Sequence, residues 1–235
     1  METALKLYRL QQAELERAES ANRLAQVKAA LLDNSLVDAA ASAEQQTRAV
    51  QTKAQADARA LELEVQSVKT KLRNSQERMF SGKVSNPKEL ASLQGEGESL
   101  QRRIATLEDS LLDAMIALEE AQERHDSAAA HLAEITTERE RQVVDLTAEQ
   151  ERLERRCAEL DSAIAEIRAS LDAGDLSLYD HLVRRKANRP VALLSRSNVC
   201  GACGVSVPLS FASQTRAHGE LVFCPSCERI LYSQG

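Results

Sequence analysis

Aromatic residues and turn residues are scarce in this chain of 235 residues. It has no Trp, 3 Tyr, 3 Phe, 8 Gly and 4 Pro, whereas 43% of its residues are hydrophobic and 28% are charged. Most of the apolar content is therefore Ala, Leu, Val and Ile. This composition argues against a large globular core and favours long helices that bury their apolar residues along narrow seams.

Long apolar runs and an excess of basic charge are also missing. No run of about 18 apolar residues occurs, and residues 1–20 contain no apolar signal core, so we expect a cytoplasmic protein without membrane contact. The formal net charge of -6 and the pI near 5.4 exclude a generally basic coat for nucleic acid. A negative net charge of the whole chain is still compatible with basic patches in parts of it.

A seven-residue apolar repeat covers residues 100–167. One series of positions, from Ile104 to Ile167, is interrupted only by His125 and Arg139. A sustained repeat of this kind predicts a left-handed coiled coil, because about 3.5 residues per turn keep one stripe facing a partner helix. We interpret His125 and Arg139 as polar residues that fix the register of an antiparallel pair.

Residues 81–90, with the sequence SGKVSNPKEL, interrupt the helical pattern. Gly82 can adopt the left-handed conformation that ends a helix. Asn86 can cap the next helix, Pro87 suits its first position, and Glu89 completes a pattern that resembles a capping box. We therefore expect the chain to reverse direction here, at a tip near residues 81–88.

A reversal at the tip supplies the partner helix from the same chain. It brings small residues of the two arms roughly opposite each other: Ala40 and Ala128, Thr47 and Ala121, Ala54 and Ala114. The first arm is expected to break once, within LLDNSLVD at residues 31–38. There Asp33, Asn34 or Ser35 can cap a restarted helix.

Four of the five cysteines form two C-x-x-C pairs near the C-terminus: Cys200, Cys203, Cys224 and Cys227. Two such pairs can place four thiolates at the corners of a tetrahedron, which predicts one structural Zn²⁺. Four cysteine ligands leave no open position for water or substrate, so a catalytic metal is not expected. A redox dithiol is a weaker alternative, and Cys157 is interpreted as an ordinary helix residue.

Two short β-type runs, residues 191–199 and 219–223, each lead into a cysteine pair and predict two β-hairpins held together by the metal. Upstream, residues 179–189 (YDHLVRRKANR) predict a short basic helix that ends before Pro190.

The expected fold class is mainly α, with a long antiparallel coiled-coil helical hairpin and a small C-terminal β zinc ribbon. We divide the chain into a coiled-coil hairpin at residues 1–175, a basic linker helix with a lead-in strand at 176–196, and a C4 zinc ribbon at 197–235. The ribbon has few apolar residues and should need its metal in order to fold.

Two basic clusters stand out against the acidic average. Residues 69–103 hold eight basic and four acidic residues, and residues 180–196 hold five basic residues and one acidic residue, so each cluster carries a net charge of +4. The candidate residues for binding a partner are Lys83, Lys88, Arg184, Arg185, Lys186 and Arg189. They suit the phosphates of RNA or DNA and equally an acidic protein surface. The simpler alternative is that they are solvated faces of helices.

The tip sequence GKVSNPKELASLQGE, followed by RRIATLED, and the C-terminal motifs CGACGVSVPLS and CPSCERILY resemble a family of bacterial coiled-coil proteins with a C-terminal C4-type zinc ribbon, a domain of unknown function. The resemblance implies a helical hairpin with Cys200, Cys203, Cys224 and Cys227 as metal ligands. It also implies an adaptor or nucleic-acid-binding role, with a sigma factor, a secretion or flagellar component, or messenger RNA as partner. Glu228 stands where a glycine is usual in this family.

We therefore predict a non-enzymatic adaptor that bridges protein partners in transcription or in secretion and flagellar regulation. Direct RNA or DNA binding by the basic segment and the ribbon is the alternative hypothesis. An enzyme is the least supported class, since the sequence shows no phosphate-binding loop, no hydrolase triad spacing and no open metal site. Apolar positions expected to be exposed, such as Leu5, Leu10 and Leu15, leave dimerisation open.

Overall fold

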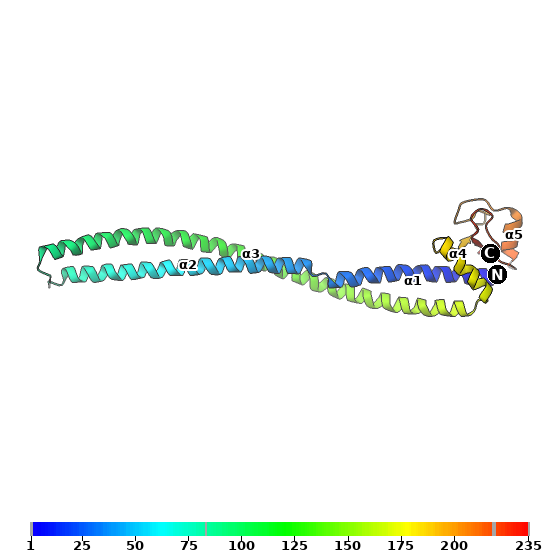
Figure 1. The fold of residues 1–235 in the computed structure, drawn as a ribbon, viewed down its shortest axis with the longest axis horizontal. Coiled ribbons are helices and arrows are strands. Elements are labelled where there is room, and N and C mark those ends of the chain that lie inside the picture. Colours follow the sequence, from blue (N-terminus) through cyan, green and yellow to red (C-terminus); the bar gives the residue numbers. More distant parts are fainter. Residues whose placement is uncertain (1, 83, 218–219, 235) are drawn as a thin grey trace. The chain divides into compact units, whose positions relative to one another are not determined.

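The computed structural model describes residues 2–82, 84–217 and 220–234. The elements in chain order are α1 (Glu2–Leu32), α2 (Ser35–Phe80), α3 (Pro87–Ala169), α4 (Ala173–Arg185), β1 (Val191–Leu193), α5 (Leu209–Ala217) and β2 (Ile230–Tyr232) (Figure 1). The predicted fold class is confirmed, because long helices form a coiled-coil hairpin and two short strands belong to a small zinc ribbon. Among the described residues, no helix is long and apolar enough to cross a membrane.

The chain groups into two compact units. The first, which we call the hairpin unit, is Asn34–Gln142, and the second, the base unit, combines Met1–Asp33 with Val143–Gly235. The hairpin unit contains α2 and the first part of α3, and the base unit contains α1, the last part of α3, α4 and the ribbon.

The tip of the hairpin unit follows the chemistry expected from its sequence. Gly82 has φ +71°, and the side-chain oxygen of Asn86 accepts a hydrogen bond from the backbone N–H of Lys88 at 3.0 Å. Pro87 is the first residue of α3. A left-handed residue ends α2 and an asparagine caps α3, so the chain reverses between them (Figure 1).

Polar contacts between α2 and α3 define an antiparallel register. Gln51 donates to Gln122 at 2.8 Å, and a ring nitrogen of His125 lies 3.0 Å from a carboxylate oxygen of Glu44. Ala121 is only 1% exposed and lines a groove together with Thr47, as the proposed pairing of small residues requires.

The break between α1 and α2 falls where it was expected, but its cap differs. α1 ends at Leu32 and α2 begins at Ser35, with Asn34 in the N-cap position. The Asn34 side chain makes no capping hydrogen bond to α2, and its oxygen instead accepts from the Arg139 guanidinium at 3.1 Å. Arg139 therefore binds the facing helix, in agreement with its interpretation as a register residue.

The base unit has a core that joins elements distant in sequence. Its buried residues are Leu7, Leu10, Tyr179, Leu182, Val191, Ile230 and Tyr232. The rings of Tyr8 and Tyr232 stack with their centroids 5.0 Å apart. The expectation that Leu10 is exposed was wrong: it is 0% exposed, because the ribbon and α4 cover this part of α1.

The helix before the ribbon is longer than predicted, and it both begins and ends at earlier residues. α4 begins at Ala173 because the Asp172 side chain accepts a hydrogen bond from Gly174 N at 3.0 Å and caps it. It ends at Arg185 rather than near residue 189, since Ala187 and Asn188 both take left-handed conformations, with φ of 50° and 61°.

The two predicted β-hairpins are present only as isolated antiparallel bridges across the two cysteine turns, Val199 with Ser206 and Phe223 with Ile230. The two regular strands were not expected to pair with each other: β1 and β2 are parallel, with Val191 opposite Ile230. The sequence analysis also missed α5, a nine-residue helix between the two cysteine pairs. Residue 219, the start of the second β-type run, lies outside the described residues.

Candidate metal centre

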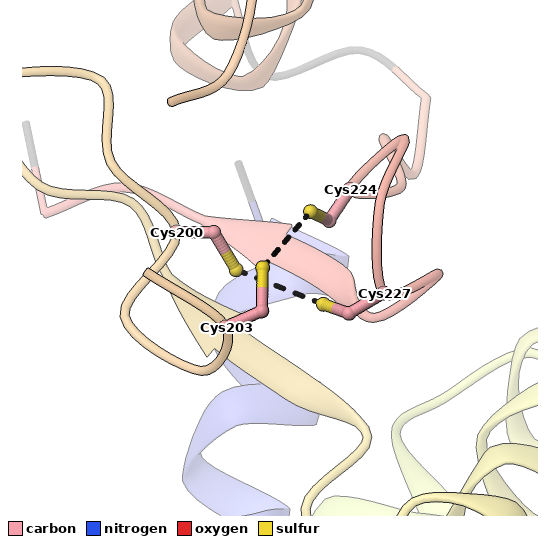
Figure 2. A group of neighbouring side chains, drawn as sticks. All are labelled: Cys200, Cys203, Cys224 and Cys227. Atoms are coloured by element: carbon pink, nitrogen blue, oxygen red, sulfur yellow. Dashed lines mark hydrogen bonds between the residues drawn. The ribbon is translucent and has the colours of Figure 1, made fainter. Parts of the chain in front are cut away.

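Two tight turns bring the four predicted cysteines together. Figure 2 shows their side chains pointing toward one another, Cys200 and Cys203 from one turn and Cys224 and Cys227 from the other. The sulfurs of Cys200 and Cys227 are 3.8 Å apart, as are those of Cys203 and Cys224, and all four lie within 4.8 Å of one another.

These distances suit a tetrahedral zinc site. Four sulfurs placed about 2.3 Å from a central Zn²⁺ lie about 3.8 Å from one another, which is the separation observed for both sulfur pairs. A set of four soft thiolate donors is also the one that structural zinc prefers. The cluster therefore forms a site for one structural Zn²⁺, as predicted.

The two turns share one backbone pattern. In the first, Cys200 N donates to Val205 O at 3.0 Å and Gly204 N donates to Cys200 O at 2.8 Å. In the second, the equivalent donors are Cys224 N, which binds Arg229 O at 2.8 Å, and Glu228 N, which binds Cys224 O at 2.9 Å. Each turn presents its sulfurs in the same way because it repeats the same hydrogen bonds.

The repeated pattern requires a left-handed residue four positions after the first cysteine of each pair. Gly204 has φ +72° and Glu228 has φ 59°. Glycine adopts this conformation without strain, whereas a residue with a Cβ does so at a cost. The glycine at position 204 thus has a backbone reason, and Glu228 keeps the same conformation in the second turn in spite of its side chain.

Gly201 is needed for a different reason, which is close packing. Its N–H donates to Leu193 O at 2.8 Å, and a Cβ at Gly201 would lie 2.9 Å from the same oxygen. A larger residue would push the first turn away from the end of β1. The contact fixes the first cysteine pair on the strand that precedes it.

The thiols differ in how readily they ionise. Burial raises the pKa of Cys200 to about 12 and also raises the pKa of Cys224. Burial opposes ionisation of Cys227 as well, but hydrogen bonds from the backbone N–H and the guanidinium of Arg229 lower its pKa to about 7. Cys227 is therefore the ligand best prepared to meet the metal as a thiolate.

The predicted basic residues beside the ribbon are only partly available. Arg184 and Arg189 are exposed. Lys186, whose side chain is 15% exposed, lies 3.0 Å from the Glu228 carboxylate, and Arg185 lies 3.8 Å from it. Glu228 is 42 residues away from Lys186 along the chain and therefore falls outside the cluster at residues 180–196. Including it reduces the charge of this cluster from +4 to +3.

The basic tip is also partly neutralised. Lys69 lies 2.6 Å from Glu108, and Arg103 lies 2.6 Å from Glu64. Both acids fall outside residues 69–103, so they reduce the net charge of the tip from +4 to +2. Lys88 is exposed at the start of α3, and the predicted residue Lys83 lies outside the described residues.

Sequence reasoning missed the most exposed aromatic residue. Phe80, the last residue of α2, is 80% exposed. The seven-residue seam of the first arm ends at Met79, so position 80 falls off the buried stripe. That offset is the signal that could have identified Phe80 as a surface residue.

Two family models match the chain. The CT398-like coiled coil hairpin domain covers residues 4–187, and the C4-type zinc ribbon domain covers residues 199–231. Neither describes an enzyme. An uncharacterized protein of Mycobacterium tuberculosis, present in two strains, is 31% identical over an alignment of 179 positions that covers 72% of this chain and 69% of the relative.

Two solved structures have a similar fold. The structure of CT398 from Chlamydia trachomatis has a TM-score of 0.59 at 19% identity, covering 99% of this chain and 94% of that one. A protein from Mycobacterium smegmatis has a TM-score of 0.64 at 20% identity, covering 98% of this chain and 97% of that one. At these identities the similarity concerns the fold alone.

Proposed function

The chain belongs to the family of the CT398-like coiled coil hairpin domain, and we propose that it is a non-enzymatic adaptor that bridges protein partners. The observation that carries the proposal is the exposure of Phe80 at the hairpin tip. An aromatic side chain that is 80% exposed has no role in the packing of the hairpin, but it is a residue type that often dominates protein interfaces.

The charges near Phe80 indicate the kind of partner. Lys88 is exposed at the start of α3, and Arg78, in the last turn of α2, lies 3.9 Å from Glu89 and is itself exposed. An apolar pocket rimmed by acidic residues would complement an aromatic side chain flanked by cations. The tip is therefore proposed to bind an acidic protein surface.

The metal centre supports the non-enzymatic part of the proposal. All four donors are cysteines, so a bound Zn²⁺ has no coordination position for a substrate. The resemblance noted in the sequence implies a sigma factor or a component of secretion or flagellar assembly as partner, and we retain these as the first candidates.

The adaptor proposal is tested by affinity capture of the tagged full chain from its native lysate after nuclease treatment. Phe80→Ser should lose proteins that the wild type recovers, whereas Leu36→Ser should retain them. Leu36 is the matched control because it is 74% exposed on the same helix, far along the chain from the tip. Recovery that disappears on nuclease treatment, or that is unchanged in Phe80→Ser, would contradict the proposal.

Direct RNA or DNA binding remains the alternative, and the exposure of Arg184 and Arg189 favours it. If phosphates bind there, the double variant Arg184→Glu, Arg189→Glu should weaken RNA binding at low salt and reduce the dependence of affinity on salt. Unchanged RNA affinity in a filter-binding assay would remove this surface from consideration.

A further inference from the structure

An apolar face of α3 in the hairpin unit lies outside the coiled-coil seam. Leu112, Met115 and Ile116 are 59%, 54% and 49% exposed. Their three- and four-residue spacing makes them neighbours on one side of the helix. The seam residues Leu111 and Leu118 flank them in the sequence, so α3 is apolar on most sides here. A helix of that kind is usually covered by more than one neighbour.

A groove between α2 and α3 adjoins this face. It has a volume of about 340 Å³ and is lined by Gln55, Ala58, Arg59, Glu62, Leu111, Met115 and Leu118. The small side chain of Ala58 leaves room for a side chain from outside. Met115 belongs both to the groove and to the exposed face, so the two form one continuous surface.

Acidic residues border the apolar face at both ends. Asp109 precedes Leu112 by three positions, and Glu119 follows Ile116 by three, so each lies one helical turn from the apolar residues on the same side. Both are exposed, and within the described part of the chain neither takes part in an ion pair. The basic residue of the groove, Arg59, is already 2.5 Å from Glu62.

We propose that this surface binds a basic amphipathic helix of a partner protein. The apolar residues of that helix would cover Leu112, Met115 and Ile116, and basic residues near its ends would face Asp109 and Glu119. These two acids are ten residues apart, or about 15 Å along α3. The partner helix therefore needs about three turns, with basic side chains about ten residues apart.

The same charges argue against a second copy of this chain as the occupant. If two copies of α3 packed antiparallel through this face, Asp109 of one would approach Glu119 of the other. In a parallel arrangement each acid would approach its own equivalent. Both arrangements place like charges together in the interface, which opposes association.

The test uses the zinc-loaded full chain and a fluorescent probe peptide of about five helical turns. The peptide consists of Leu, Ala and Lys, with Leu at helical spacing on one side. The matched acidic peptide has Glu in place of every Lys, and a scrambled peptide has the same composition as the first without its apolar side. Fluorescence anisotropy should show the basic amphipathic peptide binding at least about tenfold more tightly than either.

Two double variants locate the binding surface. Leu112→Gln with Ile116→Gln should weaken binding about tenfold, because central apolar contacts dominate interfaces. Asp109→Asn with Glu119→Gln should weaken it about threefold and lower its salt dependence, as expected for exposed charges at the rim. Leu63→Gln, which changes a 51% exposed residue of α2, is the control and should not alter binding.

Three results would overturn the proposal. The first is binding that the Leu112→Gln, Ile116→Gln variant leaves unchanged, or that Leu63→Gln reduces equally. The second is equal affinity for the scrambled peptide, which would indicate attraction by charge alone. The third is sedimentation showing a dimer that the Leu112→Gln, Ile116→Gln variant converts to a monomer, because a second copy would then occupy the face. Circular dichroism melting confirms that the variants fold.

Discussion

The side-chain amide of Gln11 in α1 binds the backbone of Val191 in β1 through two hydrogen bonds. Its nitrogen donates to Val191 O at 3.1 Å, and its oxygen accepts from Val191 N at 2.7 Å. Gln11 is 4% exposed, so water does not replace either bond. The amide thus acts as a neighbouring strand would, and it attaches the ribbon to α1.

Gln11→Ala should destabilise the base unit. The substitution leaves a buried N–H and a buried C=O of Val191 without partners, and the expected loss in free energy of unfolding is about 2–4 kcal/mol. Thermal melting should report the loss, and hydrogen exchange should show faster exchange at the Val191 amide. Gln12→Ala, at an exposed neighbouring position, is the control; equal melting of the two variants would contradict this role of Gln11.

Tyr179 should make the base unit sensitive to alkaline pH. Burial, and the hydrogen bond that its hydroxyl donates to Glu14 at 2.8 Å, raise the pKa of Tyr179 well above its ordinary value of 10.0. A group whose folded-state pKa is raised contributes stability that is complete below pH 10 and is lost as the pH rises toward the folded-state pKa. The wild type should therefore lose stability above pH 10, because the stabilising contribution of the protonated Tyr179 hydroxyl is lost there.

The variant Tyr179→Phe tests this dependence. It should be less stable than the wild type by about 1 kcal/mol at neutral pH, because it lacks the hydrogen bond to Glu14. The difference should shrink above pH 10. A difference in melting temperature that stays constant from pH 7 to 11 would show that the hydroxyl does not titrate as its surroundings indicate.

Ala121→Leu should lower the melting temperature of the hairpin unit. Ala121 is 1% exposed and faces α2 near Thr47, so a larger side chain has to separate the helices there. Overpacking of this kind costs about 1–3 kcal/mol. Ala117→Leu, at an exposed position of α3, is the control, and an equal or higher melting temperature for Ala121→Leu would count against close packing.

Removal of zinc by chelation should unfold the chain from about residue 190 onward while most of the helical circular dichroism persists. The ribbon depends on the metal because its two regular strands have only three residues each. Amide spectra should lose the dispersed signals of β1, α5 and β2. Loss of most of the helicity would show that the proposed boundary between hairpin and ribbon is misplaced.

Glu228→Gly and Glu228→Ala should have different effects on the ribbon. Both remove the contact with Lys186, but only glycine relieves the left-handed conformation at φ 59°. Glu228→Ala should melt below the wild type, and Glu228→Gly should melt above Glu228→Ala. Calorimetry of the zinc-loaded proteins measures the order, and identical melting of the two variants would rule out backbone strain at this position.

The sequence predicted the features that depend on local chemistry. The seven-residue repeat indicated the coiled coil, Gly82 and Asn86 indicated the tip, and the cysteine spacing indicated the zinc site. Each of these signals is a short motif or a regular repeat that can be recognised in the sequence without knowledge of a contact between distant segments. Once the tip was located, counting residues outward from it along both arms predicted which residues of α2 and α3 face each other. This is why the approach of Thr47 and Ala121 could be predicted.

The features that were missed depend on contacts between distant segments. β1 and β2 pair in parallel, and Val191 and Ile230 share one buried core with residues of α1, which nothing near either strand in the sequence specifies. α5 was missed because it buries only Ala212 and Thr215, which give no apolar pattern. Gln11 is polar at a fully buried position, and only a partner 180 residues away explains it.

The separation between Gln11 and Val191 also has a consequence during synthesis. Leu7, Leu10 and Gln11 are covered by segments that the ribosome completes about 180 residues later. At about 5–20 residues per second this interval is roughly 10–40 seconds. During that time α1 can form, but its apolar end stays open to water and to other proteins. Until the ribbon is complete, the nascent chain therefore exposes to other proteins an apolar surface whose residues Leu7 and Leu10 are fully buried after folding.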